Sequence, residues 1–168
     1  AYPGMMSISI DGRRHLDGGL GDNLPVSMLA ERGVKNIIAV DIRRRSTGKQ
    51  PLICAGARVI HVRNNLPLGG AFDLNASNIS RNIELGYLDT YKAFGKLCGS
   101  YFYFHPEEYA SLGEYLGEDT TGLEMAGLVY EMERTRVYSA DEFIKELNAR
   151  HQDAHDSYAD LIAAVNRE

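Results

Sequence analysis

Apolar and polar residues alternate at the start of the chain. The segment Met6–Ile10 has a period of two, which predicts a half-buried strand. Asp11-Gly12 is a strong turn dipeptide, so we expect a hairpin in which Arg13–Leu16 forms the returning strand. The beginning of the chain therefore predicts a short antiparallel pair.

A helix is predicted after this hairpin. Proline is favoured in a first helical turn, so the helix should begin near Pro25, with Asp22 or Asn23 supplying the capping oxygen or lying just before it. Gly33 stands where a C-terminal helix glycine belongs. The expected helix is short.

Two strands should follow the helix. Asn36–Ile42 is a largely apolar, β-branched run, which is typical of a parallel strand that is buried on both faces. Ala57–Val62 is a further strand candidate. The order strand, helix, strand, strand predicts an α/β sheet.

The pattern becomes helical in the second half of the chain. Apolar residues recur at helical spacing over Asn75–Lys96, and Tyr101–Phe104 reads as a core strand. Ser139 and Glu142 form a capping-box pair. Further helices are expected over Pro106–Leu116, Thr121–Arg134, Ala140–Asn148 and Gln152–Asn166. The change near residue 105 suggests two regions, 1–105 and 106–168.

Composition narrows the classes of function. The chain has 168 residues, 44% of them hydrophobic, and a formal net charge of −5, which fits a globular protein and argues against nucleic-acid binding. No apolar run approaches the roughly 18 residues that suggest a membrane span. Cys54 and Cys98 lie far apart, which fits a reducing compartment better than a disulfide framework.

One ten-residue run carries specific information. Asp17-Gly18-Gly19 is followed by Asn23, Pro25 and Val26 at the start of the predicted helix. The run resembles the motif of the patatin-like phospholipases, in which D-G-G is followed by N-x-P-V and a hydrophobic strand. Arg81-Asn82-Ile83, Leu85-Gly86-Tyr87 and Asp89-Thr90 also look like the continuation of bacterial members. The resemblance covers about residues 3–105.

The resemblance implies a fold, an activity and a role for each motif residue. It implies a three-layer α/β/α domain, present in part here, with a helical C-terminal region. It implies hydrolysis of acyl esters of phospholipids or related lipids, with no cofactor and no metal. Asp17 would be the general base of a Ser–Asp dyad, Gly18 and Gly19 would shape the turn, and Asn23 and Pro25 would set the helix start.

A Ser–Asp dyad requires its aspartate, here Asp17, to act as a base. A serine hydroxyl is a weak nucleophile until a base takes its proton. An exposed aspartate is a poor base, whereas a partly apolar pocket raises its pKa toward the working range. The alternative is structural: Asp17 caps the turn or pairs with Arg13 or Arg14.

The nucleophile of the dyad is not among these residues. No G-x-S-x-G sequence occurs in the chain, and the glycine-rich oxyanion loop of the family is also missing. We therefore expect the C-terminal portion of a longer enzyme, inactive by itself, which associates through an exposed strand edge with its missing N-terminal part or with itself. A non-catalytic α/β binding module is the alternative. Peripheral membrane contact and a cytoplasmic location both remain open.

Other candidate sites are less specific. Arg43-Arg44-Arg45 and Arg63-Asn64-Asn65 each follow a predicted strand and could line one ligand-binding edge, but a solvated loop is the preferred interpretation of the arginine run. His151 and His155 share a helix face without a third metal ligand, so surface histidines are expected. His15 lies beside the motif and is interpreted as a strand residue with a polar tip.

Overall fold

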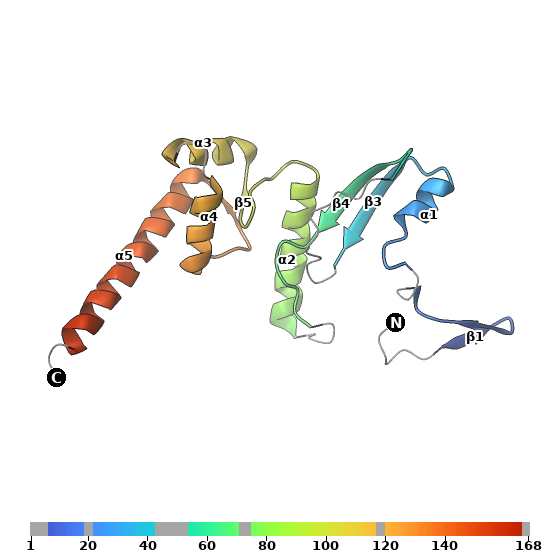
Figure 1. Cartoon of the computed structure of the whole chain (residues 1–168), viewed down its shortest axis with the longest axis horizontal. Helices are drawn as coiled ribbons and strands as arrows, with labels where there is room; N and C mark the ends of the chain where they lie inside the picture. The colour runs from blue at the N-terminus through green and yellow to red at the C-terminus, as the bar shows by residue number, and fades with distance from the viewer. Residues whose placement is uncertain (1–6, 19–21, 43–53, 71–74, 117–119, 166–168) are drawn as a thin grey trace. The chain divides into compact units, whose positions relative to one another are not determined.

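The computed structural model describes residues 7–18, 22–42, 54–70, 75–116 and 120–165. The chain has mixed α and β structure and divides into two compact units, Ala1–Arg63 and Asn64–Glu168 (Figure 1). The change in composition near residue 105 falls inside the second unit. Each unit is described by itself below.

The first unit opens with the expected hairpin. Strand β1 (Ile8–Ile10) pairs antiparallel with β2 (Arg13–His15), and Ile10 lies opposite Arg13. Asp11 and Gly12 both have positive φ, 52° and 73°, which is the conformation of a type I′ turn. All six strand residues are exposed, so the prediction of a half-buried strand is wrong for the described chain.

Helix α1 (Val26–Glu31) begins and ends as the sequence predicts. Pro25 is the N-terminal cap residue, and Val26 is the buried residue of the helix. The helix ends in a Schellman arrangement, because Gly33 N donates to Ala30 O at 2.9 Å and Val34 N donates to Leu29 O at 3.1 Å. These bonds satisfy carbonyls that the last turn would otherwise leave without donors.

Strands β3 (Asn36–Asp41) and β4 (Arg58–Arg63) run parallel, with Ile37 opposite Val59. Ile37 and Ala39 pack with Val26 of α1 and are buried. The expectation that this strand is buried on both faces is wrong: Ile38 is 61% exposed and Val40 is 59% exposed. Alternate residues of a strand point to opposite faces, and α1 covers only one of them.

The second unit begins with a long helix. Helix α2 (Ala76–Ala93) lies within the predicted range, and the Asn75 side chain caps it by accepting from Asn78 N at 2.8 Å. Leu85 and Leu88 form its buried face. Ile83 lies outside this buried face and is 69% exposed.

The remaining elements enclose an aromatic core. They are β5 (Tyr103–Phe104), α3 (Pro106–Leu116), α4 (Thr120–Val129), β6 (Val137–Tyr138) and α5 (Ala140–Val165). Phe102, Phe104, Tyr138 and Phe143 are almost fully buried, and the Phe143 ring meets the other three edge-on at centroid distances of 5.1–5.4 Å. Such contacts add stability beyond the burial of apolar area.

Three details differ from the sequence-based expectation. The predicted strand at Tyr101–Phe104 is only two residues long, since the Phe102 amide bonds to a side chain instead of a neighbouring strand. Helix α4 ends at Val129, shortly before Glu131 adopts a φ of 53°. The two helices expected after Ser139 are one continuous helix, α5.

Candidate functional site

The Asp17 loop lies between the hairpin and α1. Asp22 N donates to Gly18 O at 2.9 Å, and the Asp22 carboxylate accepts from Leu24 N at 2.9 Å. These two bonds join Gly18 to Asp22 and Asp22 to Leu24, directly after Asp17. Asp22 therefore precedes the helix cap, as one of the sequence alternatives predicts, while Gly19 lies outside the described residues.

Asp17 is exposed, as are Gly18, Asn23 and Pro25. Pro25, the cap residue of α1, provides no side-chain hydrogen bond, so the helix start depends on the turn at Asp22 and on the burial of Val26. An apolar surrounding for the Asp17 carboxylate, which the dyad chemistry favours, is not provided by the described residues of the first unit. The described loop thus presents the aspartate without enclosing it.

The basic residues of the hairpin have their own contacts. Arg14 donates to Ser7 Oγ from both Nε and Nη2, at 3.2 Å and 2.8 Å. His15 Nδ1 lies 3.0 Å from the backbone oxygen of Arg13, which agrees with its interpretation as an exposed strand residue.

A polar group gathers at the carboxyl ends of β3 and β4. His61 Nε2 lies 3.5 Å from a carboxylate oxygen of Asp41, and Arg63 Nε donates to His61 Nδ1 at 3.1 Å. Ligands of open α/β sheets bind at this edge. The sequence analysis predicted Arg63 at this edge but not Asp41 and His61. Both of these lie within predicted strands, where nothing in the sequence distinguishes them as site residues. Arg43, Arg44 and Arg45 lie outside the described residues.

Three polar side chains of α2 have a structural role within the second unit. Asp89 accepts from Asn65 N at 3.0 Å, Arg81 Nη1 donates to Pro67 O at 3.1 Å, and Asn82 Nδ2 donates to Leu68 O at 2.8 Å. These three side chains therefore bind the backbone of the segment that precedes α2, so that this segment lies against the helix. Their spacing of seven residues, from Asn82 to Asp89, is the sequence signal of a shared face.

Asp89 also joins a buried pair with Tyr103. The Tyr103 hydroxyl donates to Asp89 at 2.7 Å, and both residues are almost fully buried. Burial raises the pKa of Asp89, although hydrogen bonds from Tyr103 and Asn65 oppose this. Burial and the bond to Asp89 likewise raise the pKa of Tyr103. Lys92 lies 5.4 Å from the Tyr103 ring centre, and burial lowers its pKa.

Sequence reasoning also missed Glu124, a carboxylate with 0% exposure. It accepts from the backbone amides of Ser100, Tyr101 and Phe102 at 2.6–2.9 Å, and from the Tyr109 hydroxyl at 2.9 Å. Gly99 has a φ of +106°, and a Cβ there would lie 2.6 Å from Phe102 O. Glu124 thus fixes a turn that requires glycine, which is a structural role.

The second unit also contains an acidic hollow. Glu108, Ser111, Glu114, Ala140 and Asp141 line it. Glu108 accepts from Ala140 N at 2.8 Å and so caps α5. Among the described residues, no three side chains of histidine, cysteine, aspartate or glutamate come together in a way that could hold a metal ion.

The comparisons with known proteins give no assignment. The chain matches no protein-family model, no curated protein and no solved structure. In the part of the chain that the structure describes, no helix combines the length and apolar character needed to cross a bilayer. Function must therefore be argued from the residues themselves.

Proposed function

We propose that this chain supplies the aspartate half of a serine acyl-hydrolase site of the patatin-like type. The observation that carries the proposal is the run from Asp17 to Val26 in its setting. It follows an antiparallel hairpin, is closed by the bond from Asp22 N to Gly18 O, opens a short helix and leads into a parallel strand pair. A motif found in the setting that its chemistry needs is stronger support than the same residues alone.

Asp17 would act as the general base toward a serine from a segment outside these 168 residues. The serine oxygen attacks the carbonyl carbon of an acyl ester, and its proton passes to the Asp17 carboxylate. The tetrahedral intermediate collapses, and the departing alcohol takes that proton. Water then attacks the acyl-serine, gives a proton to Asp17 and releases the acid, and the proton returns to the serine oxygen.

The segment that brings the serine must also supply two features that the described loop does not. One is a set of backbone donors for the developing oxyanion, whose loss typically costs about 100- to 1000-fold in rate. The other is an apolar wall beside the Asp17 carboxylate, because a carboxylate surrounded by water is a weak base. For both reasons we propose that the chain is inactive alone.

The exposed apolar face of β3 supports a three-layer α/β/α arrangement as the fold that we propose. Parallel strands occur almost exclusively in sheets that are covered on both faces. Ile38 and Val40 give β3 an outward apolar face. In the proposed three-layer α/β/α arrangement, further polypeptide would cover this face and extend the sheet. Lipids or other acyl esters would be the substrates, taken up from a membrane surface or from solution.

A non-catalytic binding module is the second candidate. The group formed by Asp41, His61 and Arg63 favours it, since these polar side chains gather at the sheet edge where ligands of open α/β sheets bind. If the chain is a binding module, the role of Asp17 is only structural, in the loop before α1. The two candidates differ in whether substitution of Asp17 affects a covalent reaction.

Covalent labelling of the natural polypeptide that contains these residues tests the proposal. A fluorophosphonate probe should label one serine, and Asp17→Asn should slow labelling by at least about 100-fold. Asp11→Asn is the matched control, because Asp11 is an exposed aspartate in the hairpin that precedes Asp17 and its positive φ is one that asparagine accepts. Equal labelling rates for Asp17→Asn and the wild type would leave the binding module as the better account.

A further inference from the structure

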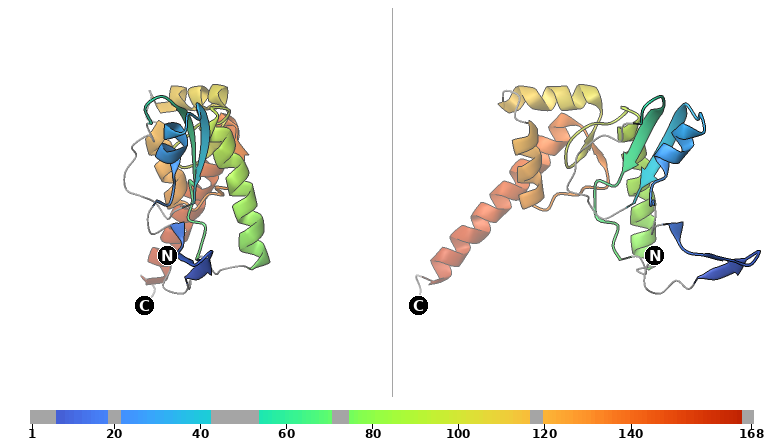
Figure 2. Two further views of the ribbon diagram at one scale, coloured as in Figure 1. Left: turned by 90° about the vertical axis from the view of Figure 1, so that its right-hand side faces the viewer. Right: turned by 45° about the vertical axis from the view of Figure 1, so that its right-hand side comes forward.

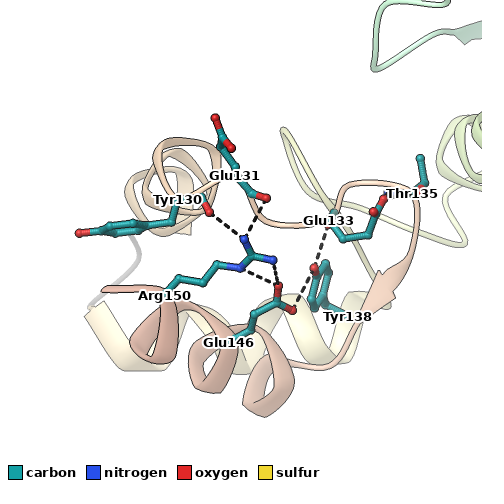
Figure 3. Close-up of polar contacts among 7 residues, drawn as sticks. All are labelled: Tyr130, Glu131, Glu133, Thr135, Tyr138, Glu146 and Arg150. Atoms are coloured by element: carbon teal, nitrogen blue, oxygen red, sulfur yellow. Dashed lines mark hydrogen bonds and ion pairs between the residues drawn. The ribbon is translucent and has the colours of Figure 1, made fainter. Parts of the chain in front are cut away.

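Among the described residues of the second unit, none buries the second half of α5. In the first half, Phe143 and Leu147 belong to the aromatic core. Arg150 then fastens the helix, since Nη1 donates to the backbone oxygens of Tyr130 and Glu131 at 3.1 and 3.3 Å, and Nη2 pairs with Glu146 at 3.0 Å (Figure 3). Beyond this point α5 runs past α3 and α4 (Figures 1 and 2), and residues 152–160 are all exposed.

This exposed half is amphipathic, with an apolar face and a polar face. Ala154, Tyr158 and Ile162 follow one another at intervals of four, so they share one face, and Tyr158 and Ile162 are 64% and 43% exposed. Leu147 and His151 precede them on that face, and Leu161 and Val165 continue the alternation of three and four in the sequence. This is the spacing of a coiled-coil seam, which pairs with a second helix.

The seam is defined as the face of α5 that carries Leu147, His151, Ala154, Tyr158 and Ile162. We propose that its exposed part, from Ala154 onward, pairs antiparallel with the same segment of a second copy of this chain. This pairing is independent of the proposed catalytic role of Asp17. It makes the seam a self-association surface with two-fold symmetry, in which each copy presents the same residues to the other.

The charge distribution fits a second copy as the occupant. The chain has a net charge of −5, so two copies repel each other unless their acidic residues stay apart. The acidic residues of the exposed segment, Asp153, Asp156 and Asp160, lie on the face opposite the seam. Two copies can therefore approach along the seam without bringing these carboxylates together.

The packing of the first half of α5 sets the direction of pairing. There the seam face is already occupied, because Leu147 packs into the core with Leu112 of α3 and Leu123 of α4. A parallel partner helix would run into these elements. An antiparallel partner meets only the exposed half, and Tyr158 then lies near the two-fold axis.

The size of the surface limits the strength of the pairing. The exposed half spans about 15 residues, or roughly 22 Å of helix. Two helices in contact over that length bury less than the about 1,600 Å² of a standard stable interface. We therefore expect a reversible dimer with a dissociation constant between about 1 and about 500 μM.

Sedimentation velocity of the 168-residue chain, from about 1 μM to about 500 μM, tests this pairing across the expected affinity range. The mass should rise from that of the 18.6 kDa monomer toward twice this value. Tyr158→Glu and Ile162→Glu should remain monomeric throughout. Ala159→Glu is the matched control, because it places the same charge on the same helix away from the seam, and it should dimerise like the wild type.

Two results would overturn the proposal. One is a wild-type chain that remains monomeric at the highest concentration. The other is association that persists unchanged in Tyr158→Glu, which would assign the contact to another surface such as the exposed face of β3. Circular dichroism of each variant at low concentration shows that the rest of the chain is folded, since Tyr158 and Ile162 lie outside the aromatic core.

Discussion

The two units differ in how completely they bury their own apolar residues. In the second unit, the described core cluster holds nine buried side chains, and its aromatic rings meet edge to face. In the first unit, the described cluster around α1 and β3 holds three, namely Val26, Ile37 and Ala39. The first unit carries the motif, and the second contains most of the buried hydrophobic residues that the structure describes.

This difference agrees with the proposed function. A region that lends one residue to a shared site needs surface that becomes buried when the other part arrives. Ile38, Val40 and Ile42, which are 61%, 59% and 71% exposed, provide such a surface. A region with a complete core can instead determine the stability of the chain. Substitutions at three sites and the pH dependence of stability distinguish the roles of the two units.

Replacing the central ring of the second unit should have the largest effect. Phe143→Ala removes a fully buried ring that touches three others, so the free energy of unfolding should fall by about 3–5 kcal/mol. Urea unfolding followed by circular dichroism measures this loss. Val129→Ala, at a residue that is 76% exposed, should change stability by less than about 0.5 kcal/mol. A Phe143→Ala loss below about 1 kcal/mol would contradict the assignment of the core.

Removing the buried carboxylate should have the next largest effect. Glu124→Leu leaves the amides of Ser100, Tyr101 and Phe102 without their acceptor, and an unsatisfied buried group costs about 1–3 kcal/mol. We expect a loss of about 3 kcal/mol in total and faster hydrogen exchange at these three amides. Glu124→Gln keeps one acceptor oxygen and should lose less. Equal exchange rates in Glu124→Leu and the wild type would show that the turn does not depend on this residue.

Asp89 should make the stability of the second unit depend on pH. Its pKa is raised in the folded chain, mainly by burial, so folding favours the protonated form. The resulting stability is fully present below the pKa of an unfolded aspartate and is lost as pH rises through the folded pKa. The difference in unfolding free energy between wild type and Asp89→Asn, measured against pH, should follow this course. A difference that stays constant across the acidic range would contradict it.

The smallest effect is expected on the outward face of β3. Ile38→Thr keeps the β-branched shape and changes an exposed position, so the stability of this chain should shift by less than about 0.5 kcal/mol. Ile37→Thr, one residue away on the buried face, places a hydroxyl in the small core and should cost more than about 1 kcal/mol. Thermal unfolding that separates the two units compares them. Equal losses would show that both faces of β3 are buried.

Local signals predicted much of the fold. The turn at Asp11-Gly12, the glycine end of α1 at Gly33 and the reciprocal bonds between Ser139 and Glu142 all depend on neighbouring residues, and the structure confirms each. The strands at Asn36–Ile42 and Ala57–Val62 were also predicted from their apolar, β-branched residues, and the structure shows that they pair in parallel.

Long-range features could not be predicted in the same way. Glu124 bonds to amides 22–24 residues away, and Asp89 bonds to Asn65 across 24 residues, so no local pattern reveals either contact. The one-sided burial of β3 depends on which elements cover it. For the candidate site, the sequence predicts Asp17, Gly18, Asn23 and Pro25, and this assignment stays a prediction. The exposure of Asp17 depends on which elements surround it, so no local pattern reveals it.

The central claim is that Asp17 works only with a serine from outside this chain. Hydrolysis of a p-nitrophenyl acyl ester by the purified 168-residue chain, beside the natural polypeptide that contains it, tests this most directly. We predict no turnover above the uncatalysed rate for the chain alone, and turnover by the natural polypeptide that Asp17→Asn abolishes. Turnover by the chain alone that disappears in Asp17→Asn would contradict the claim.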